Sequence, residues 1–188
     1  MAAAVLGTEW GAVGLRIWSQ LLIPGLFQPA EYARALLVAE QTDISDENID
    51  ALVAARLRRQ EILDRAEPPD VVCVLDETAM HRLIGSPAIM HDTLVHVAEL
   101  AQRPNIVVQV VPAGIGANAG LGGAFDIATC DGMPDTLRMD GVEDVTSQAR
   151  ALVRKASVAF DRCRGDALPR AASLTRIMEG IEQWKQTS

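Results

Sequence analysis

The segment VVCVLDETAMHRLIGSPAIMHDTLVHVAELAQRPNIVVQVV, residues 71–111, decides the fold that we expect for this chain. It opens and closes with continuous apolar runs, 71–75 and 106–111, of the length typical of strands buried on both faces. Between them, Ser86 and Pro87 begin a helical pattern. A strand, a helix and a second strand make a crossover long enough for a parallel pair. The segment therefore predicts a parallel β-α-β core.

Two later segments, AFDIATC at 124–130 and DTLRM at 135–139, are separated by the turn DGMP and predict an antiparallel hairpin on the sheet edge. Helices are expected at 29–40, at 45–64, at 144–164 with Gly165 as its stop, and from Pro169 to about Lys185. The predicted fold class is α/β (α+β), a small mixed sheet packed by N- and C-terminal helices. No repeat or composition shift divides the chain, so residues 1–188 are expected to form a single ligand- or partner-binding domain without a DNA-binding domain.

Composition argues against several classes of partner. Acidic residues outnumber basic ones 25 to 17, for a net charge of -8, so the surface should repel phosphate backbones and direct nucleic-acid binding is not expected. No stretch approaches the length of a membrane helix, and the N-terminus lacks the basic start of a signal peptide. The three cysteines are widely spaced and are interpreted as reduced thiols. We therefore expect a cytoplasmic protein.

The predicted helix at 45–64 places Arg56 and Gln60 near the middle of its apolar face. A buried guanidinium without a partner is costly, so Arg56 should meet an anion or a strong acceptor. One interpretation is a core clamp, in which Arg56 pairs with a carboxylate such as Asp76 or Glu77 and ties the helix to the sheet. The other is a clamp on a ligand.

Asp76 and Glu77 follow the first predicted strand at its carboxyl end, the edge where open α/β sheets place their ligands. Asp76 is also explained as a helix N-cap. Glu77 and His81 are four residues apart on one short helix, so they can form an acid–base pair or a simple surface ion pair. If the chain is an enzyme, Asp76, Glu77 and His81 are the predicted catalytic residues. No spacing of histidine, cysteine and carboxylate predicts a metal site, and no cofactor is expected.

The loop GIGANAG, residues 114–120, follows a strand as a phosphate-binding fingerprint does, but a strand rather than a helix is expected after it. It also lacks the lysine of a P-loop, so a lid or a pocket wall is the better interpretation. Gln109 interrupts the apolar run IVVQVV and must form a hydrogen bond if it is buried. It either lines a mostly apolar pocket or faces solvent.

Five stretches together resemble a known family over nearly the whole chain. They are LLIPGLFQPAEYARALL (21–37), ARLRRQEIL (55–63), VCVLDETAMHRLIGSPAIM (72–90), VAELAQRPNIVVQVVP (97–112) and GANAGLGGAFDIA (116–128). Their order and spacing are similar to the domain of unknown function that follows the helix-turn-helix in actinobacterial XRE-type, antitoxin-like transcriptional regulators. The chain departs from the family between Arg138 and Glu143, where it lacks an aromatic-rich strand.

The resemblance implies that the domain senses a small molecule or docks a small regulatory protein and thereby controls an attached DNA-binding domain, which this chain is expected to lack. A homodimer is compatible with this role. The residues implied in ligand binding are Gln28, Tyr32, Arg56, Gln60, Arg82, Gln109 and Gly120.

A second hypothesis stays open beside the sensor. A pocket inherited from such a regulator can be repurposed as a cofactor-independent enzyme, for instance a cyclase or isomerase of specialised metabolism. Arg56 would then hold an anionic group of the substrate while the acid–base residues act on it. Fold alone does not decide between the two, because function depends on the site.

Overall fold

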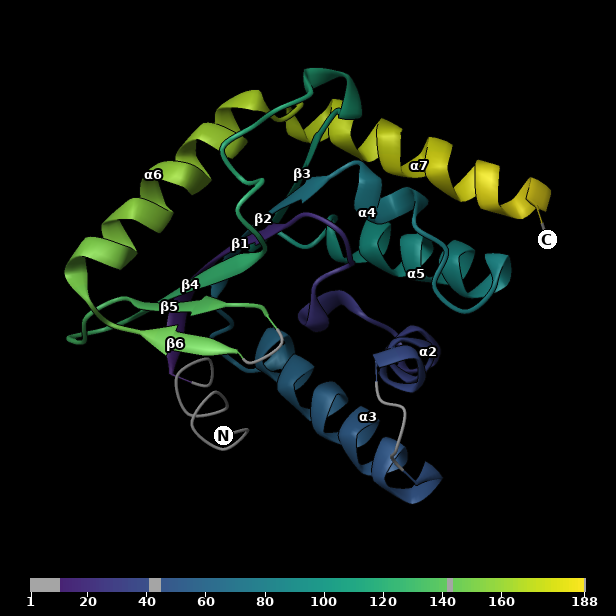
Figure 1. Ribbon diagram of the computed structural model, residues 1–188, viewed down its shortest axis with the longest axis horizontal. Helices are drawn as coiled ribbons and strands as arrows, with labels where there is room; N and C mark the ends of the chain where they lie inside the picture. The colour runs from purple at the N-terminus through teal and green to yellow at the C-terminus, as the bar shows by residue number, and fades with distance from the viewer. Residues whose placement is uncertain (1–10, 41–44, 142–143, 188) are drawn as a thin grey trace.

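One mixed sheet forms the centre of a computed structural model of the chain, which describes residues 11–40, 45–141 and 144–187 (Figure 1). The prediction that the N-terminus is no signal peptide concerns mostly residues 1–10, which lie outside the described residues. The strands are β1 (Ala12–Ser19), β2 (Asp70–Asp76), β3 (Ile106–Val111), β4 (Phe125–Cys130), β5 (Thr136–Met139) and β6 (Val145–Ser147). Their order across the sheet is β3-β2-β1-β4-β5-β6.

The parallel half of the sheet confirms the predicted β-α-β core. β2 pairs with β3 in parallel, with Cys73 opposite Val108, and helix α5 (Pro87–Leu100) connects the two strands. The side chain of Ser86 accepts a hydrogen bond from the backbone N–H of Ile89, so the expected N-cap forms. Because apolar side chains lie on both faces of these strands, the two runs do not alternate regularly between apolar and polar residues.

β1 is a central strand that the sequence analysis missed. It pairs in parallel with β2 and antiparallel with β4, and so joins the β-α-β core to the hairpin. Its sequence AVGLRIWS does not show the continuous apolar run of a buried strand, because Gly14 and Arg16 interrupt the apolar residues. Arg16 remains near the surface, where its guanidinium lies 3.0 Å from the carboxylate of Asp135.

The predicted hairpin forms as β4 and β5, but it does not lie at the sheet edge. β6 pairs outside β5, with Val145 opposite Met139. This corrects the prediction of a helix from residue 144: the β-branched pair Val145 and Thr146 is extended, and helix α6 (Arg150–Asp166) begins only afterwards. The helix also passes Gly165, which was expected to stop it.

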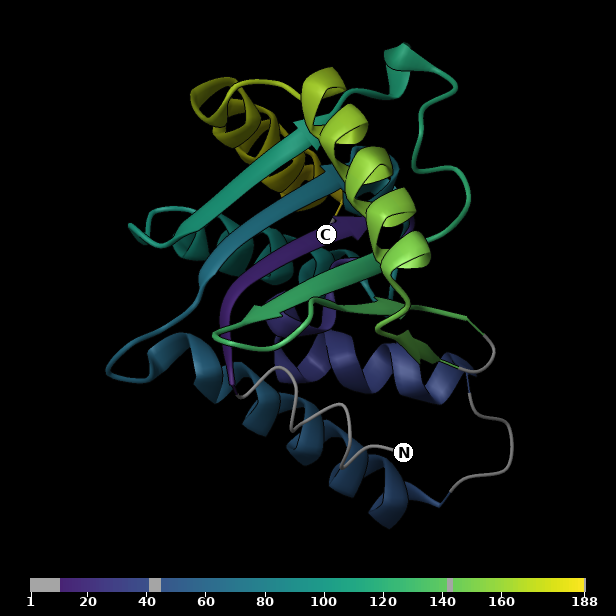
Figure 2. The ribbon, with the colours of Figure 1, turned by 90° about the vertical axis from the view of Figure 1, so that its left-hand side faces the viewer.

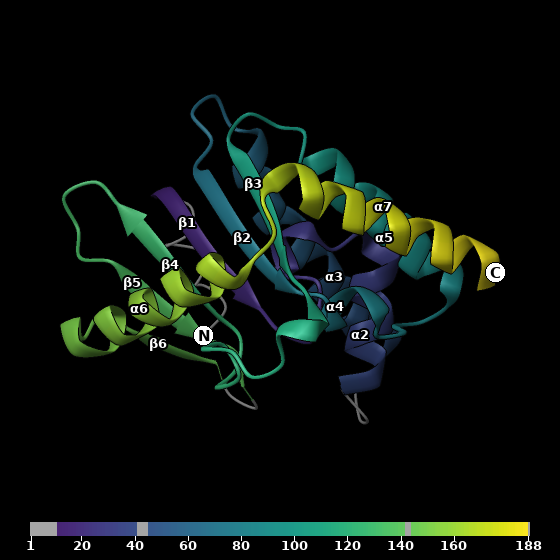
Figure 3. The same ribbon diagram turned by 90° about the horizontal axis from the view of Figure 1, so that it is seen from above.

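Helices cover both faces of the sheet, α6 on one and α2 (Ala30–Glu40), α5 and α7 (Arg170–Thr187) on the other, as Figures 2 and 3 show. The predicted helix at 45–64 is α3 (Asp46–Gln60) followed by a 3-10 turn, η2 (Glu61–Asp64). The shorter elements are η1 (Gly25–Phe27), α4 (Thr78–His81) and η3 (Ala113–Ile115).

Two apolar cores lie on the two faces of the sheet, and a third, smaller cluster of Leu37, Ile49 and Val53 joins α2 to α3. The larger core joins α2, α5 and α7 to the face of the sheet that carries Leu15, Cys73 and Val108. The smaller core lies under α6, where Phe160 packs with Trp18. Burial in the larger core raises the pKa of the Cys73 thiol far above its ordinary value, so this cysteine is unreactive.

Candidate functional site

The carboxyl ends of the parallel strands β1, β2 and β3 meet at one edge of the sheet, which we call the carboxyl edge. Three loops leave the sheet there, at residues 20–28, 76–86 and 112–124. Thr78 Oγ1 donates to the backbone oxygen of Gln20 over 2.9 Å, so the first two loops are in contact. Open α/β sheets place their ligands at this edge, which makes it the first candidate site.

Asp76, at the end of β2, fastens two of these loops. One carboxylate oxygen accepts from the backbone N–H of Thr78 at 3.0 Å and lies 2.5 Å from its hydroxyl oxygen, although Glu77 rather than the expected Asp76 occupies the N-cap position of the short helix α4. The other oxygen lies 3.4 Å from the amide nitrogen of Asn118 in the glycine-rich loop. Both oxygens of Asp76 are therefore occupied by the protein itself.

Glu77 connects the glycine-rich loop to the last helix. It is buried, and its carboxylate accepts from the backbone N–H of Ala113 at 2.7 Å and from the guanidinium of Arg176 on α7 at 2.6 Å. Burial raises the pKa of Glu77, but the Ala113 and Arg176 hydrogen bonds and the Arg176 charge outweigh it and hold the pKa below its ordinary value. His81 Nε2 lies 3.7 Å away, beyond hydrogen-bond distance. A carboxylate held ionised by two donors is poorly suited to acid–base chemistry.

Four of the predicted ligand-binding residues come together around segment 23–28, and we call them the turn cluster: Gln28, Tyr32, Arg56 and Gln60. The backbone N–H of Ile23 donates to the hydroxyl of Tyr32 over 3.1 Å, and Gln28 Nε2 donates back to the Ile23 oxygen over 2.6 Å. Gln60 Nε2 lies 2.9 Å from the backbone oxygen of Gly25 and 2.7 Å from that of Gln28. The turn cluster thus holds the irregular backbone of LIPGLFQ through its own polar groups.

Arg56 does not pair with Asp76 or Glu77, so the core-clamp interpretation named the wrong partner for its guanidinium. Its Nη1 donates to Gln28 Oε1 over 2.8 Å, while the two carboxylates are taken by other groups. Burial lowers the pKa of Arg56 from its ordinary value, against a smaller opposite effect of Glu40. The amide oxygen of Gln28 thus satisfies one donor of a guanidinium whose residue is only partly buried.

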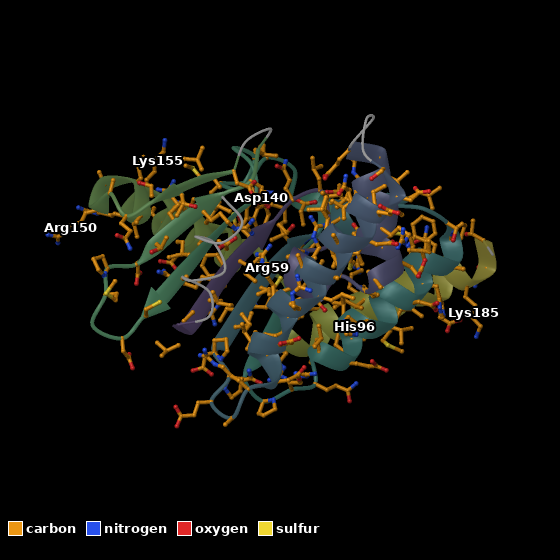
Figure 4. The ribbon with its side chains drawn as sticks, turned by 90° about the horizontal axis from the view of Figure 1, so that it is seen from below. Arg59, His96, Asp140, Arg150, Lys155 and Lys185 are labelled. Atoms are coloured by element: carbon orange, nitrogen blue, oxygen red, sulfur yellow. The ribbon has the colours of Figure 1, made fainter. Side chains whose placement is uncertain are left out.

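A small hollow of about 10 Å³, room for about one water molecule, lies beside the turn cluster. It is lined by Leu15, Ile17, Pro24, Gly25, Leu26, Arg59, Asp126 and Arg138. Arg138 forms ion pairs with Asp126 at 2.5 Å and Asp140 at 3.1 Å. Burial raises the pKa of Asp140, and the charge of Arg138 opposes that effect. Figure 4 shows Arg59 and Asp140 on the same side of the molecule.

The structure places two of the other three predicted ligand-binding residues, Gln109 and Gly120, away from the turn cluster. Gln109 lies on the α6 side of the sheet, where its amide bonds the backbone oxygen of Leu168 and the guanidinium of Arg164. Gly120 packs on Trp18, whose indole N–H donates to the Gly120 oxygen over 2.9 Å. Arg82 is exposed beyond α4, but its charge is close enough to Tyr32 to oppose the rise that burial causes in the pKa of the Tyr32 hydroxyl. Gln109 therefore forms internal hydrogen bonds that join β3 to the chain between α6 and α7, in place of the two expected roles in a pocket lining or at a solvated face.

Sequence reasoning missed several residues that shape the carboxyl edge. Arg176 and Trp18 are far in sequence from the residues that they contact, Glu77 and Gly120, and no local pattern indicates these partners. Four large apolar side chains in the three loops are about half exposed: Leu21 at 47%, Leu83 at 53%, Ile115 at 46% and Leu121 at 55%. The signal for the last two was present in the sequence, because residues 112–125 carry no charged side chain.

Within the described ranges, no three histidine, cysteine or acidic side chains are grouped as metal ligands would be, and no helix has the length and apolarity to cross a bilayer. A second hollow is an open depression along one face of α7 that includes Met178 and Glu182. It has walls from a single helix and so does not enclose a ligand.

Comparison with known proteins gives one match. No curated protein and no solved structure matches the chain. A family model described as a domain of unknown function, DUF5753, matches residues 2–179, which is most of the chain. The protein therefore belongs to the DUF5753 family.

Proposed function

We propose that this protein is a partner-binding domain that docks another protein at the carboxyl edge of its sheet. The observation that carries the proposal is the glycine-rich loop, an exposed stretch without charged residues that presents Ile115 and Leu121 to solvent. Leu21 and Leu83 lie in the two other loops at the same edge. Exposed apolar side chains gathered on loops over a rigid sheet are typical of binding surfaces.

The loop is held at its start and at two points further along, which suits docking better than closure over a ligand. Glu77 fixes its start at Ala113, Asn118 contacts Asp76, and the Gly120 oxygen receives the Trp18 indole N–H. A loop that is already ordered loses little conformational entropy when a partner binds. These anchors support a preformed surface rather than the mobile lid expected from the glycine content.

A small-molecule sensor has less support. The hollow beside the turn cluster has room for about one water molecule, whereas a pocket that binds a small molecule typically has a volume of about 300 Å³ or more. The polar groups of Gln28 and Gln60 are also used by the protein's own backbone. The enzyme hypothesis has even less support, because the carboxylates of Asp76 and Glu77, which would act as acid or base, already accept hydrogen bonds from the protein itself.

We further propose the regulatory setting that the sequence resemblance implies. In that setting the domain acts in the cytoplasm of an actinobacterium, and docking of a small protein controls an attached or associated DNA-binding domain of the XRE type. The acidic character of the chain supports an indirect role, since its charge of -8 disfavours contact with DNA phosphates.

Site-specific photo-crosslinking in cells tests the proposal. A benzophenone amino acid at position 115 should give an adduct with a partner protein, and the probe at position 121 should capture that same partner. The probe at exposed Val38 on α2 should not. In the purified pair, Leu121→Asp should weaken binding at unchanged melting temperature. Adducts of equal yield at position 38, or none at 115 and 121, overturn the proposal. A low-mass ligand that shifts the melting temperature without any protein adduct supports the sensor instead.

A further inference from the structure

Helix α6 is locally basic within an acidic protein. It carries five basic side chains, Arg150, Arg154, Lys155, Arg162 and Arg164, and only two acidic ones. The rest of the chain then has 12 basic and 23 acidic residues. Positive charge is thus concentrated on one helix of about 25 Å, at 1.5 Å per residue.

The cations of α6 are exposed on its outer face. Residues Ala156, Phe160 and Cys163 face the sheet, so at about 100° per residue the outward direction passes through Val158. Three cations, Arg154, Lys155 and Arg162, and one carboxylate, Asp161, lie within about 60° of it, so positive charge is in excess on this face. Figure 4 shows Lys155 pointing away from the body of the molecule at its outer rim, with Arg150 beyond it.

These cations are not used inside the protein. Over the described ranges, Arg150, Arg154, Lys155 and Arg162 form no ion pair, whereas Arg138 and Arg176 are both paired with carboxylates. An excess of unneutralised charge on a single helix face raises the potential there and attracts anionic partners. The surface made by Arg154, Lys155, Val158 and Arg162, which we call the α6 face, is therefore available for an anionic group.

We propose that the α6 face docks an acidic protein surface, namely that of the partner bound at the carboxyl edge. This inference rests on the proposed function and adds the chemistry of the partner: carboxylates beside an apolar segment. Figures 2 and 3 show the glycine-rich loop running beside α6, so one partner can touch both.

Two observations favour a protein over a nucleic acid as the occupant. Val158 lies at the centre of the cationic face and is 45% exposed, and an apolar side chain between cations suits a protein interface but adds nothing to phosphate contact. The net charge of -8 also repels a long polyanion, while a compact acidic patch meets mainly the local field of α6.

Charge reversal with a matched control tests the inference. Arg154→Glu/Lys155→Glu is compared with Arg58→Glu/Lys185→Glu, which makes the same change in net charge at exposed positions on α3 and α7. The probes are short fluorescent poly-L-glutamate and a short DNA duplex at low salt, and sedimentation measures self-association. The α6 reversal should weaken poly-L-glutamate binding by about tenfold or more, because two ion-pair attractions become repulsions. The control should change it much less.

Several results overturn the inference: no binding of poly-L-glutamate by the native protein, equal losses in both variants, or tighter binding of DNA that the α6 reversal abolishes. A dimer that the α6 reversal dissociates assigns the face to a second copy and also overturns it. The readouts separate the two proposals, since Leu121→Asp should leave poly-L-glutamate binding unchanged. If crosslinking at 115 and 121 fails while the α6 reversal behaves as expected, the carboxyl-edge proposal alone is wrong. Unchanged melting temperatures in all variants confirm that each is folded.

Discussion

Replacing Gly120 by alanine should destabilise the fold without touching any charge. A Cβ built at Gly120 overlaps the indole ring of Trp18 at Cε2, Cζ2 and Nε1. Trp18 cannot move aside easily, because it is fully buried between the sheet and α6. The added methyl group must therefore push the loop off the indole, which also lengthens the hydrogen bond from the Trp18 N–H to the Gly120 oxygen.

The magnitude follows from these two losses. Forcing an extra methyl group into a packed site costs about 1–3 kcal/mol, and a disrupted buried hydrogen bond adds about 1 kcal/mol, for about 2–4 kcal/mol in total. In a chain of 188 residues each kcal/mol lowers the melting temperature by about 2–4 °C. We expect the melting temperature of Gly120→Ala to fall by about 5–15 °C.

Calorimetry or thermal denaturation followed by circular dichroism measures the shift, with Gly122→Ala as the matched control. Gly122 lies in the same loop, and a Cβ there meets nothing within 4 Å. Near-ultraviolet circular dichroism should also change in Gly120→Ala, because the environment of Trp18 is disturbed. Equal melting temperatures for the two variants would show that the loop does not rest on the indole, and Gly120 would return to the set of ligand-binding candidates.

Three further predictions concern polar groups. Gln60→Ala removes the donor to two backbone oxygens of the turn and should lower the free energy of unfolding by about 1–3 kcal/mol, measured by urea denaturation against Gln102→Ala on the surface. Glu77 has a pKa below its ordinary 4.5, so its stabilisation is present above that pH and is lost as pH falls through the folded pKa; the stability difference between native protein and Glu77→Gln should shrink in acid titrations. Burial raises the pKa of Cys163 to about 11, so the partly exposed Cys130 should react first with a thiol reagent at pH 8, as mass spectrometry of labelled peptides can show.

The parts of the fold that the sequence predicted are those set by local pattern. The runs at 71–75 and 106–111 form strands as predicted, although Val72, Val107 and Gln109 on the α6 face are only partly buried. The Ser86–Pro87 start of α5 depends only on neighbouring residues. β1 was missed because its burial depends on strands paired with it from both sides. β6 was missed for a related reason, since Val145 fits a helical spacing as well as a strand, and only pairing with β5 decides between them.

The candidate site shows the same division. Sequence marked Gln28, Arg56 and Gln60 as unusual, and they do meet in space, but their partners are backbone groups and each other rather than a carboxylate. Periodicity can show that a polar side chain is buried; it cannot show which acceptor it will find. The partner of Glu77 is Arg176, 99 residues away, and only the packing of α7 on α5 brings them together.

The residues that anchor the scaffold and the residues proposed to bind a partner form separate sets, although Leu21, Leu83 and Leu121 lie within the stretches that carry the family resemblance. The side chains of Gln28 and Gln60 form internal hydrogen bonds, and Gly120 leaves room for the Trp18 ring. These three residues therefore determine the scaffold. Ile115 and Arg154 face solvent and can change without cost to folding. Proteins that share the scaffold residues should therefore share the sheet and the anchored loop while differing in the apolar and charged side chains displayed there. Specificity for a partner would then depend on the exposed side chains of the glycine-rich loop and the α6 face rather than on the residues that anchor the scaffold.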